Sequence, residues 1–217
     1  MWKKIALFLL WLPAWSSAQT LPYEAEVQKF EAADRQTPPP ARPILFIGSS
    51  SFTYWWEVQA AFPDKQPILN RAFGGSTLTD LLRHYPRIVP KYQPRQVVMY
   101  CGENDIATAN ATADEVYERF VRLFTQIRRD LPGVPFVYVA MKPSPARWAL
   151  RETYQDGNAR IRAYLRKQRK AQFVDVWPVM LDPRTRRPVP ALFTADSLHM
   201  NEQGYARWTK LLRPTLR

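Results

Sequence analysis

Residues 43–56, PILFIGSSSFTYWW, are the stretch from which the rest of this chain can be placed. They open with a continuous apolar run at 44–47, which is too short for a helix and is bounded by a proline and a glycine. Such a run is typical of a strand buried on both faces, and it indicates a parallel sheet. Ser49, Ser50 and Ser51 follow at the carboxyl end of the strand, where open α/β sheets bind their ligands. A hydroxyl at this place can equally cap the next helix, so other parts of the chain must decide its role.

The length of 217 residues and a hydrophobic content of 46% favour one domain with a sizeable core. Near its start the chain has two lysines, an apolar run at 5–15 and small residues up to 18, which is the order of a secretory signal peptide. The apolar run is short for a membrane span and contains Pro13. We therefore expect residues 1–18 to be cleaved and the protein to be periplasmic or secreted. Cys101 is the only cysteine, so no lipid-anchor cysteine lies near the cleavage site and no internal disulfide forms.

The chain carries a formal net charge of +12, which falls to +10 without the two lysines of the predicted signal peptide. In an exported protein this excess favours contact with anionic glycans or membrane surfaces, and it gives no reason to expect a nucleic-acid partner. Part of the excess lies at residues 160–170. There Ile161, Tyr164 and Leu165 mark the apolar stripe of a helix, so the charges are expected to form its solvated face.

The rest of the chain alternates between strand and helix patterns. A helical leader at 19–42, ended by a run of prolines, precedes one domain at 43–217. Within that domain two capping boxes, Thr77 with Asp80 and Thr112 with Glu115, predict helix starts. Apolar runs predict five strands, near residues 44–47, 67–72, 96–101, 135–141 and 173–176.

The last two helices are predicted from weaker signals. Residues 146–170 are expected to be mostly helical with a break near Gly157, and a final helix is expected to begin at Asn201. Strand alternates with helix five times, and crossover connections between parallel strands are right-handed. The sequence therefore predicts a three-layer α/β/α sandwich around a central five-stranded parallel sheet.

A serine nucleophile needs a base within hydrogen-bond reach, and the base needs an orienting acceptor. Of the two histidines, His84 falls inside a helical segment beyond the stripe that faces the sheet, and we expect it at the surface. His199 follows Asp196 by three residues in a loop. A turn there can hold the carboxylate against one ring nitrogen while the other nitrogen faces the pocket. An Asp-x-x-His spacing is also common by chance, and the carboxylate could instead cap nearby amides.

Acyl transfer also needs donors that face the oxygen which becomes negative in the tetrahedral intermediate. The backbone amides of Ser50 and Gly75 and the side-chain amide of Asn104 are candidates, because all follow predicted strands. Gly75 has no Cβ to obstruct a substrate, although it could be a plain turn glycine. Asn104 could equally hold its own loop through an Asx turn.

Taken together, the four short sequence blocks that contain Ser50, Gly75, Asn104 and the pair Asp196 and His199 resemble the SGNH hydrolases, the family of GDSL-type esterases and lipases. The resemblance implies a flavodoxin-like fold, Ser50 as nucleophile, Asp196 and His199 as acid and base, and no cofactor. It also implies oxyanion-hole donors at Ser50, Gly75 and Asn104. The family usually has an aspartate where this chain has Ser49. The carboxylate that would fix the loop is missing, and only hydrogen bonds of the Ser49 hydroxyl can keep part of that role. The matching blocks are Gly48-Ser49-Ser50, Phe73-Gly74-Gly75-Ser76, Gly102-Glu103-Asn104-Asp105 and Asp196-Ser197-Leu198-His199.

Weaker candidates for substrate binding are Lys142, Asn158 and Tyr54. Lys142 follows the fourth predicted strand and could reach the rim of the pocket, but a solvated lysine in a proline-stiffened loop is the favoured interpretation. Tyr54 belongs to an aromatic cluster with Trp55 and Trp56, which could line the pocket, stack on a sugar or pack on the sheet. Two distant histidines and one cysteine predict no metal site.

The function that these residues imply is that of an exported serine esterase. Five strands, their helices and short connections nearly use up the chain, and no long insertion remains to form a lid or a deep apolar tunnel. We therefore expect short acyl groups on a carbohydrate or small-molecule alcohol. Alternatives are a lysophospholipase or thioesterase for longer acyl chains, an acyltransferase to a sugar hydroxyl, and a carbohydrate-binding module without catalysis. The partner is expected to be a small-molecule or glycan ester; the oligomeric state is not predicted.

Overall fold

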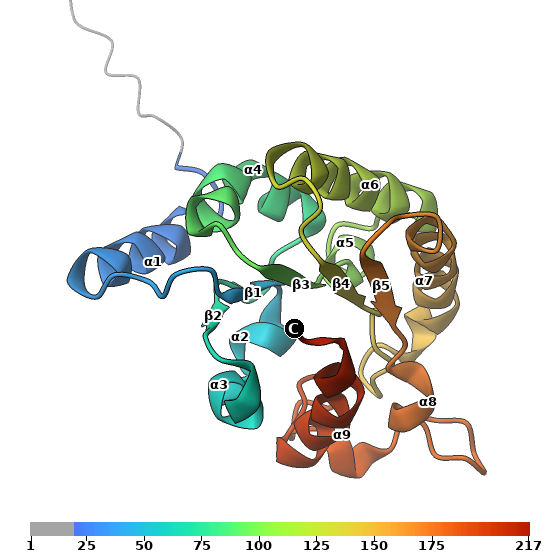
Figure 1. Cartoon of the computed structure of the whole chain (residues 1–217). Coiled ribbons are helices and arrows are strands. Elements are labelled where there is room, and N and C mark those ends of the chain that lie inside the picture. Colours follow the sequence, from blue (N-terminus) through green and yellow to red (C-terminus); the bar gives the residue numbers. More distant parts are fainter. Residues whose placement is uncertain (1–19) are drawn as a thin grey trace, which may run out of the picture.

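The computed structural model describes residues 20–217, so the predicted signal peptide at 1–18 lies outside the described residues. Within them the strands form a five-stranded parallel sheet, as the sequence predicted, and their spatial order is β2-β1-β3-β4-β5. The strands are β1 (Ile44–Gly48), β2 (Ile68–Asn70), β3 (Gln96–Tyr100), β4 (Phe136–Val139) and β5 (Ala171–Val174). They run through the middle of the molecule with helices on both faces (Figure 1).

The helices form the two outer layers of the predicted sandwich (Figure 1). One layer contains α4 (Leu78–Ile88), α6 (Ala113–Asp130) and α7 (Arg151–Leu165), with α1 (Glu24–Gln36) packed on α4. The other contains α2 (Ser50–Thr53), α3 (Val58–Ala61), α8 (Trp177–Met180) and α9 (Glu202–Leu212). The short α5 (Glu103–Ala107) follows β3. No helix of residues 20–217 is long and apolar enough to cross a membrane.

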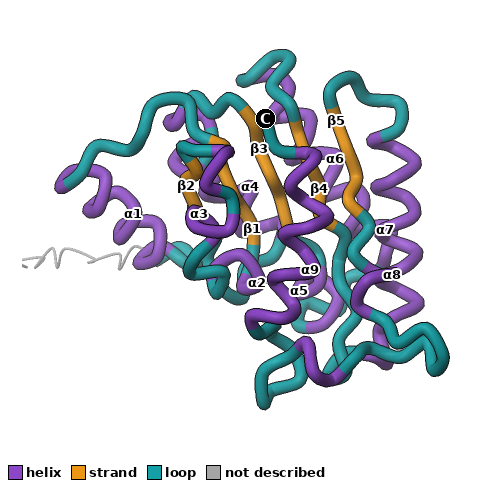
Figure 2. The backbone as a smooth tube through the Cα atoms, turned by 60° about the horizontal axis from the view of Figure 1, so that its bottom comes forward, coloured by secondary structure: helices purple, strands orange, loops and turns teal. Residues whose placement is uncertain are grey.

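The register of the central strands brings their carboxyl ends to one edge. Gly48 at the end of β1 pairs with Tyr100 at the end of β3, so α2 and α5 begin beside each other (Figure 2). Gly48 has a φ of +136°, and a Cβ there would lie 1.8 Å from the carbonyl oxygen of Tyr100. Only glycine allows the chain to leave the sheet this close to its neighbour, directly before the serines.

Local signals set the helix starts. The capping boxes of Thr77 with Asp80 and of Thr112 with Glu115 are both formed and begin α4 and α6. Asn201 caps α9 through its side chain, which accepts hydrogen bonds from two backbone amides. These predicted helix starts are confirmed, because side-chain caps satisfy amides that a helix cannot pair internally.

Two predictions about the helices are wrong. Gly157 does not break the helix: α7 continues through it, and a Cβ there would lie 2.8 Å from Met141 Cε. The missing side chain therefore allows close packing of α7 on the segment after β4. His84 is not at the surface but buried, with Nε2 2.6 Å from the carbonyl oxygen of Pro22 and its ring edge-to-face with Phe73. The N-terminal segment covers this side of α4, and a helical period cannot show that cover.

Candidate active site

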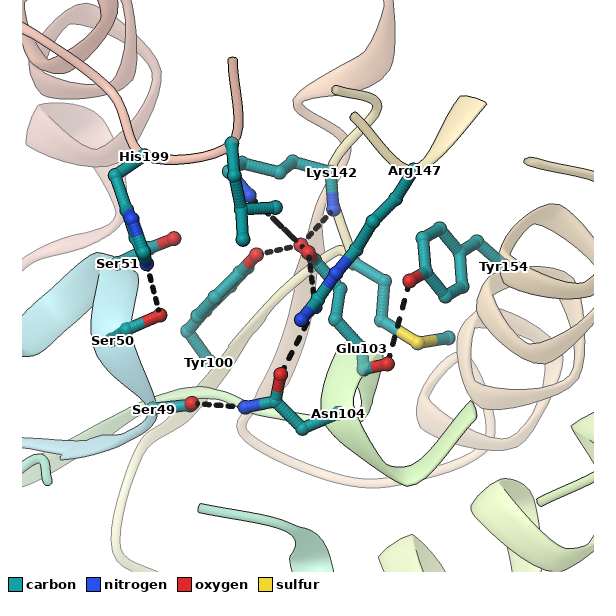
Figure 3. A network of polar contacts seen from close by, with 12 residues as sticks. Ser49, Ser50, Ser51, Tyr100, Glu103, Asn104, Lys142, Arg147, Tyr154 and His199 are labelled. Atoms are coloured by element: carbon teal, nitrogen blue, oxygen red, sulfur yellow. Dashed lines mark hydrogen bonds and ion pairs between the residues drawn. The ribbon is translucent and has the colours of Figure 1, made fainter. Parts of the chain in front are cut away.

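The carboxyl edge of the sheet brings together Ser50, His199 and Asp196. Ser50 is the first residue of α2, and its Oγ lies 3.0 Å from Nε2 of His199 (Figure 3). The other ring nitrogen of His199, Nδ1, lies 2.5 Å from Oδ2 of Asp196. A hydroxyl, an imidazole and a carboxylate are thus linked in the order that nucleophilic catalysis by serine requires.

Hydrogen bonds within the loop from Thr194 to His199 hold the carboxylate of Asp196 in place, in addition to its contact with the histidine ring. Its Oδ1 accepts the backbone amides of Leu198 and His199, both at 2.9 Å, and the hydroxyl of Thr194 at 2.8 Å. Partial burial raises the pKa of Asp196, but hydrogen bonds from the backbone amides of His199 and Leu198 outweigh it and hold this pKa well below its usual range. The ionised carboxylate keeps Nδ1 of His199 as the donor, which leaves Nε2 to accept the proton of Ser50.

Backbone amides are available beside the serine. Within residues 20–217 the N–H groups of Ser50 and Gly75 have no hydrogen-bond acceptor. Gly75 has a φ of +81°, and a Cβ there would lie 2.9 Å from the hydroxyl of Tyr23, so tyrosine packing and backbone conformation demand this glycine. The neighbouring Gly74 faces the nucleophile, since a Cβ on it would lie 3.9 Å from Cβ of Ser50.

Asn104 lies in the same site, but its side-chain amide is already engaged. Its Nδ2 donates to Oγ of Ser49 at 2.7 Å and to the carbonyl oxygen of Ser76 at 3.1 Å. Its Oδ1 accepts from a guanidinium nitrogen of Arg147 at 3.0 Å. Arginine can only donate and a carbonyl can only accept, so these partners fix which way the amide points. The hydroxyl of Ser49, in place of the family's usual aspartate, joins the end of β1 to Asn104.

A buried charged network lies behind Asn104 (Figure 3). Glu103 accepts from the ammonium of Lys142 at 3.2 and 3.3 Å, from the backbone amide of Lys142 at 3.0 Å and from the hydroxyl of Tyr100. Arg147 lies 3.5 Å from the same carboxylate. The Lys142 side chain is only 1% exposed, so it is neither solvated nor at the rim of the pocket. Burial lowers the pKa of Lys142, and the Glu103 carboxylate opposes that effect.

Asn158 is also engaged inside the protein. It is buried on α7, where its Oδ1 accepts the backbone amide of Met141 at 3.0 Å and its Nδ2 donates to the carbonyl of Met141 at 2.9 Å. Met141 lies past the end of β4, where the ladder no longer pairs its backbone groups. A buried backbone must be satisfied, and Asn158 serves that structural need instead of substrate binding.

The aromatic cluster after Ser50 divides between site and core. The ring of Tyr54 meets the ring of His199 edge-to-face at 4.7 Å, so this weak candidate does lie at the site. Trp55 is 4% exposed and packs in the core, whereas Trp56 is 76% exposed. Only Trp55 of the three packs beneath the site.

Sequence reasoning missed Arg147, Ser76 and the role of Asp105. Asp105 is buried and accepts the amide of Leu78 and the guanidinium of Arg119, both at 2.9 Å, so it joins α5 to the start of α4 and to α6. An acidic residue shortly after an apolar strand was a usable signal for such a partner. Arg147 had none, because its partners are more than 40 residues away. In the described part of the chain no group of three potential metal ligands converges.

Comparison with known structures supports the fold. A candidate platelet activating factor from Streptococcus pneumoniae is 22% identical, with a TM-score of 0.78 over 89% of this chain and 92% of that chain. A GDSL-like lipase from Bacteroides thetaiotaomicron is 20% identical, with a TM-score of 0.74 over 88% and 97%. An acetyl-xylooligosaccharide esterase from Geobacillus is 14% identical, with a TM-score of 0.66 over 81% and 94%. At these identities each likeness shows the fold alone.

Sequence comparison is more specific about the family. No curated protein sequence matches this chain. The model of the GDSL-like lipase/acylhydrolase family, however, matches residues 47–207. That span runs from the end of β1 into α9 and contains every block from which the resemblance was inferred. The chain therefore belongs to the GDSL-like lipase/acylhydrolase family, among the SGNH hydrolases.

Proposed function

We propose that this protein is an exported serine esterase that cleaves short-chain carboxylic esters of a carbohydrate or small-molecule alcohol. The observation that carries this proposal is the unbroken chain of contacts from Ser50 through His199 to Asp196. Export is inferred from the sequence pattern of residues 1–18 alone. Membership of a lipase and acylhydrolase family makes ester hydrolysis the expected reaction class.

In the proposed mechanism Oγ of Ser50 attacks the ester carbonyl while Nε2 of His199 takes the hydroxyl proton. Asp196 stabilises the imidazolium that forms. His199 then protonates the leaving alcohol, and the acyl group remains on Ser50. Water, deprotonated by the same histidine, attacks the acyl-enzyme and releases the carboxylic acid.

The negative oxygen of each tetrahedral intermediate is expected to accept the amides of Ser50 and Gly75. For Asn104 to contribute, the N–H that now contacts Ser49 must be shared with that oxygen. An oxyanion is a far stronger acceptor than a neutral hydroxyl, so the exchange is favourable once charge develops. The hydroxyl of Ser49 thus holds the amide beside Ser50 until the substrate arrives.

Labelling with a fluorophosphonate tests the assignment of the nucleophile. The wild-type protein should be labelled at Ser50, and Ser50→Ala should lose the label completely because no other hydroxyl of residues 20–217 is hydrogen-bonded to the imidazole of His199. Ser51→Ala is the matched control and should keep the label. Ser49→Ala should be labelled more slowly, since Asn104 loses one of its partners. Persistent labelling of a folded Ser50→Ala protein would show that another residue is the nucleophile.

The surroundings of Ser50 support the choice of short acyl groups. Polar groups of Ser49, Ser76 and Asn104 lie beside Ser50 on the side of the proposed oxyanion site. A long acyl chain needs an apolar cavity to bury its surface. A neighbour in fold is an esterase of acetylated xylooligosaccharides, which agrees with this choice.

A series of p-nitrophenyl esters below their micelle concentrations measures acyl preference. Acetyl and butyryl esters should be cleaved with a higher kcat/KM than lauryl or palmitoyl esters. A maximum at long chains would reject the short-acyl proposal and favour a lysophospholipase or thioesterase.

A further inference from the structure

A large hollow lies on the His199 side of the candidate site. It has a volume of about 1050 Å³ and extends between the segment of Tyr54 to Ala61 and the first turns of α9. Both segments belong to the same outer layer of the sandwich (Figure 1). His199 and Asp196 contribute to its wall, whereas Gly75 and Asn104 do not. The hollow therefore adjoins the proposed base and lies away from the proposed oxyanion donors.

That position decides which half of an ester the hollow can receive. The general acid must reach the oxygen that leaves, and here the acid is the protonated Nε2 of His199. The alcohol half must consequently lie on the His199 side, while the carbonyl oxygen turns toward the amides of Ser50 and Gly75. The hollow is thus placed for the alcohol half of the substrate and not for the acyl half.

The walls of the hollow combine flat aromatic rings with hydrogen-bonding groups. Tyr54 is 40% exposed and Trp56 is 76% exposed, and their ring centroids lie 6.0 Å apart. Trp55 stacks on Tyr205 beneath them, with centroids 5.0 Å apart at 24°, which gives the hollow a packed base. Aromatic rings offer broad apolar contact at little cost in side-chain entropy. The polar side chains of Glu202 and Gln203 also line the hollow, where they can bind hydroxyl groups, whereas Asn201 is engaged in capping α9.

The charge of the hollow is opposite to that of the chain as a whole. Glu57, Asp196 and Glu202 contribute carboxylates to its walls, and none of the residues that line it is a lysine or an arginine. The whole chain nevertheless has a net charge of +12. Carboxylates around a ligand disfavour an anionic group through repulsion at short range. This local charge argues against phosphate or uronate in the alcohol half.

We propose that the hollow is a subsite for a neutral sugar unit, whose apolar face lies against Trp56 and Tyr54 and whose hydroxyls bind the polar side chains of Glu202 and Gln203. The proposal rests on the esterase function above, because it assigns the alcohol half of the same substrate. The net charge alone favoured anionic glycans as partners. With this proposal the basic surface can still attract an anionic matrix, but the sugar bound at the site itself is neutral.

The test compares substrates that share an acetyl group and differ only in the alcohol. These are p-nitrophenyl acetate, an acetylated neutral xylooligosaccharide and an acetylated oligogalacturonide of similar length. Trp56→Ala should lower kcat/KM for the neutral sugar ester by about tenfold, the effect of exposing apolar surface equal to about two CH₂ groups. It should lower kcat/KM for p-nitrophenyl acetate by a clearly smaller factor, because that leaving group is a single ring without sugar hydroxyls. Trp56→Phe should restore most of the loss because a ring remains.

Trp148→Ala is the matched control, since Trp148 is a partly buried tryptophan that packs on Trp177 outside the hollow. It should change kcat/KM for p-nitrophenyl acetate and for the neutral sugar ester by equal factors. Replacing Glu57 and Glu202 together with glutamine should raise the activity ratio of anionic to neutral sugar ester by about threefold or more, because two repulsive charges are removed.

Failure of the subsite differs from failure of the esterase function. Suppose that p-nitrophenyl acetate is cleaved and Ser50 is labelled. If Trp56→Ala then changes kcat/KM for p-nitrophenyl acetate and for the neutral sugar ester by the same factor, or changes neither, the sugar subsite is rejected. An unchanged ratio in the double glutamine variant would likewise reject the preference for a neutral sugar. If the wild-type protein cleaves no ester and Ser50 is not labelled, the esterase function itself fails.

Discussion

Replacing His199 with alanine is expected to lower kcat for p-nitrophenyl acetate by at least about 10⁴-fold, as for the histidine of other serine triads. Ser50 then has no group to accept its proton, and the leaving alcohol has no donor. His199 is partly exposed, and within residues 20–217 its imidazole is hydrogen-bonded to Ser50 and Asp196 alone, so the fold should tolerate the change. Steady-state kinetics together with a thermal unfolding curve measure both effects.

His84→Ala is the control, but not for the reason that the sequence suggested. Because His84 is buried, its loss removes the contact with Pro22 and leaves a cavity against Phe73. We expect a loss of about 1–3 kcal/mol in the free energy of unfolding, with kcat near the wild-type value below the unfolding transition. A kcat loss similar to that of His199→Ala in the folded His84 variant would show that His199 is not specifically the base.

The parts of this protein that could be predicted from sequence are those with local causes. The apolar run of β1, the capping box at Thr77 and the turn between Asp196 and His199 depend on residues within a few positions. Even the meeting of Ser50 with His199 follows from topology, since parallel strands bring their carboxyl ends to one edge. A residue type and its spacing were enough there.

The errors concern residues whose environment comes from distant segments. Lys142 has the sequence context of a solvated loop, and its burial depends on Glu103, 39 positions earlier. His84 is covered by Pro22, 62 positions earlier. Glycine is a residue type that often breaks helices, but the helix continues through Gly157, where the missing side chain lets Met141 pack closely. A periodic pattern shows which face is apolar and not which segment will cover the other face.

Asn104 shows the same limit inside the candidate site. Its place after β3 and its amide donor were predictable, but its partners were not. The donor that was expected to be open is engaged by Ser49 and Ser76, and Arg147 donates to the amide oxygen. The oxyanion role therefore requires an exchange of partners, which no motif could indicate.

The second large effect is expected at Lys142. Lys142→Met should lower the free energy of unfolding by about 3–5 kcal/mol, the usual cost of removing one partner from a buried ion pair. The side chain of Glu103 is 7% exposed and loses its closest cation, keeping only Arg147 at 3.5 Å as an ion-pair partner among the described residues. Denaturation in urea measures the change. Arg129→Met removes a surface ion pair whose arginine is 70% exposed, and it should cost less than about 1 kcal/mol.

A double variant separates the buried charge from mere loss of side-chain packing. In Glu103→Gln with Lys142→Met no uncompensated carboxylate remains, and the glutamine oxygen can still accept from Tyr100 and from the backbone amide of residue 142. The double variant should therefore be more stable than Lys142→Met alone, because the second substitution removes the cause of the damage. The ion pair does not account for the burial of this lysine in either of two cases. One is that the loss of stability in the double variant equals the sum of the losses in Lys142→Met and Glu103→Gln measured singly. The other is that Lys142→Met costs no more than Arg129→Met.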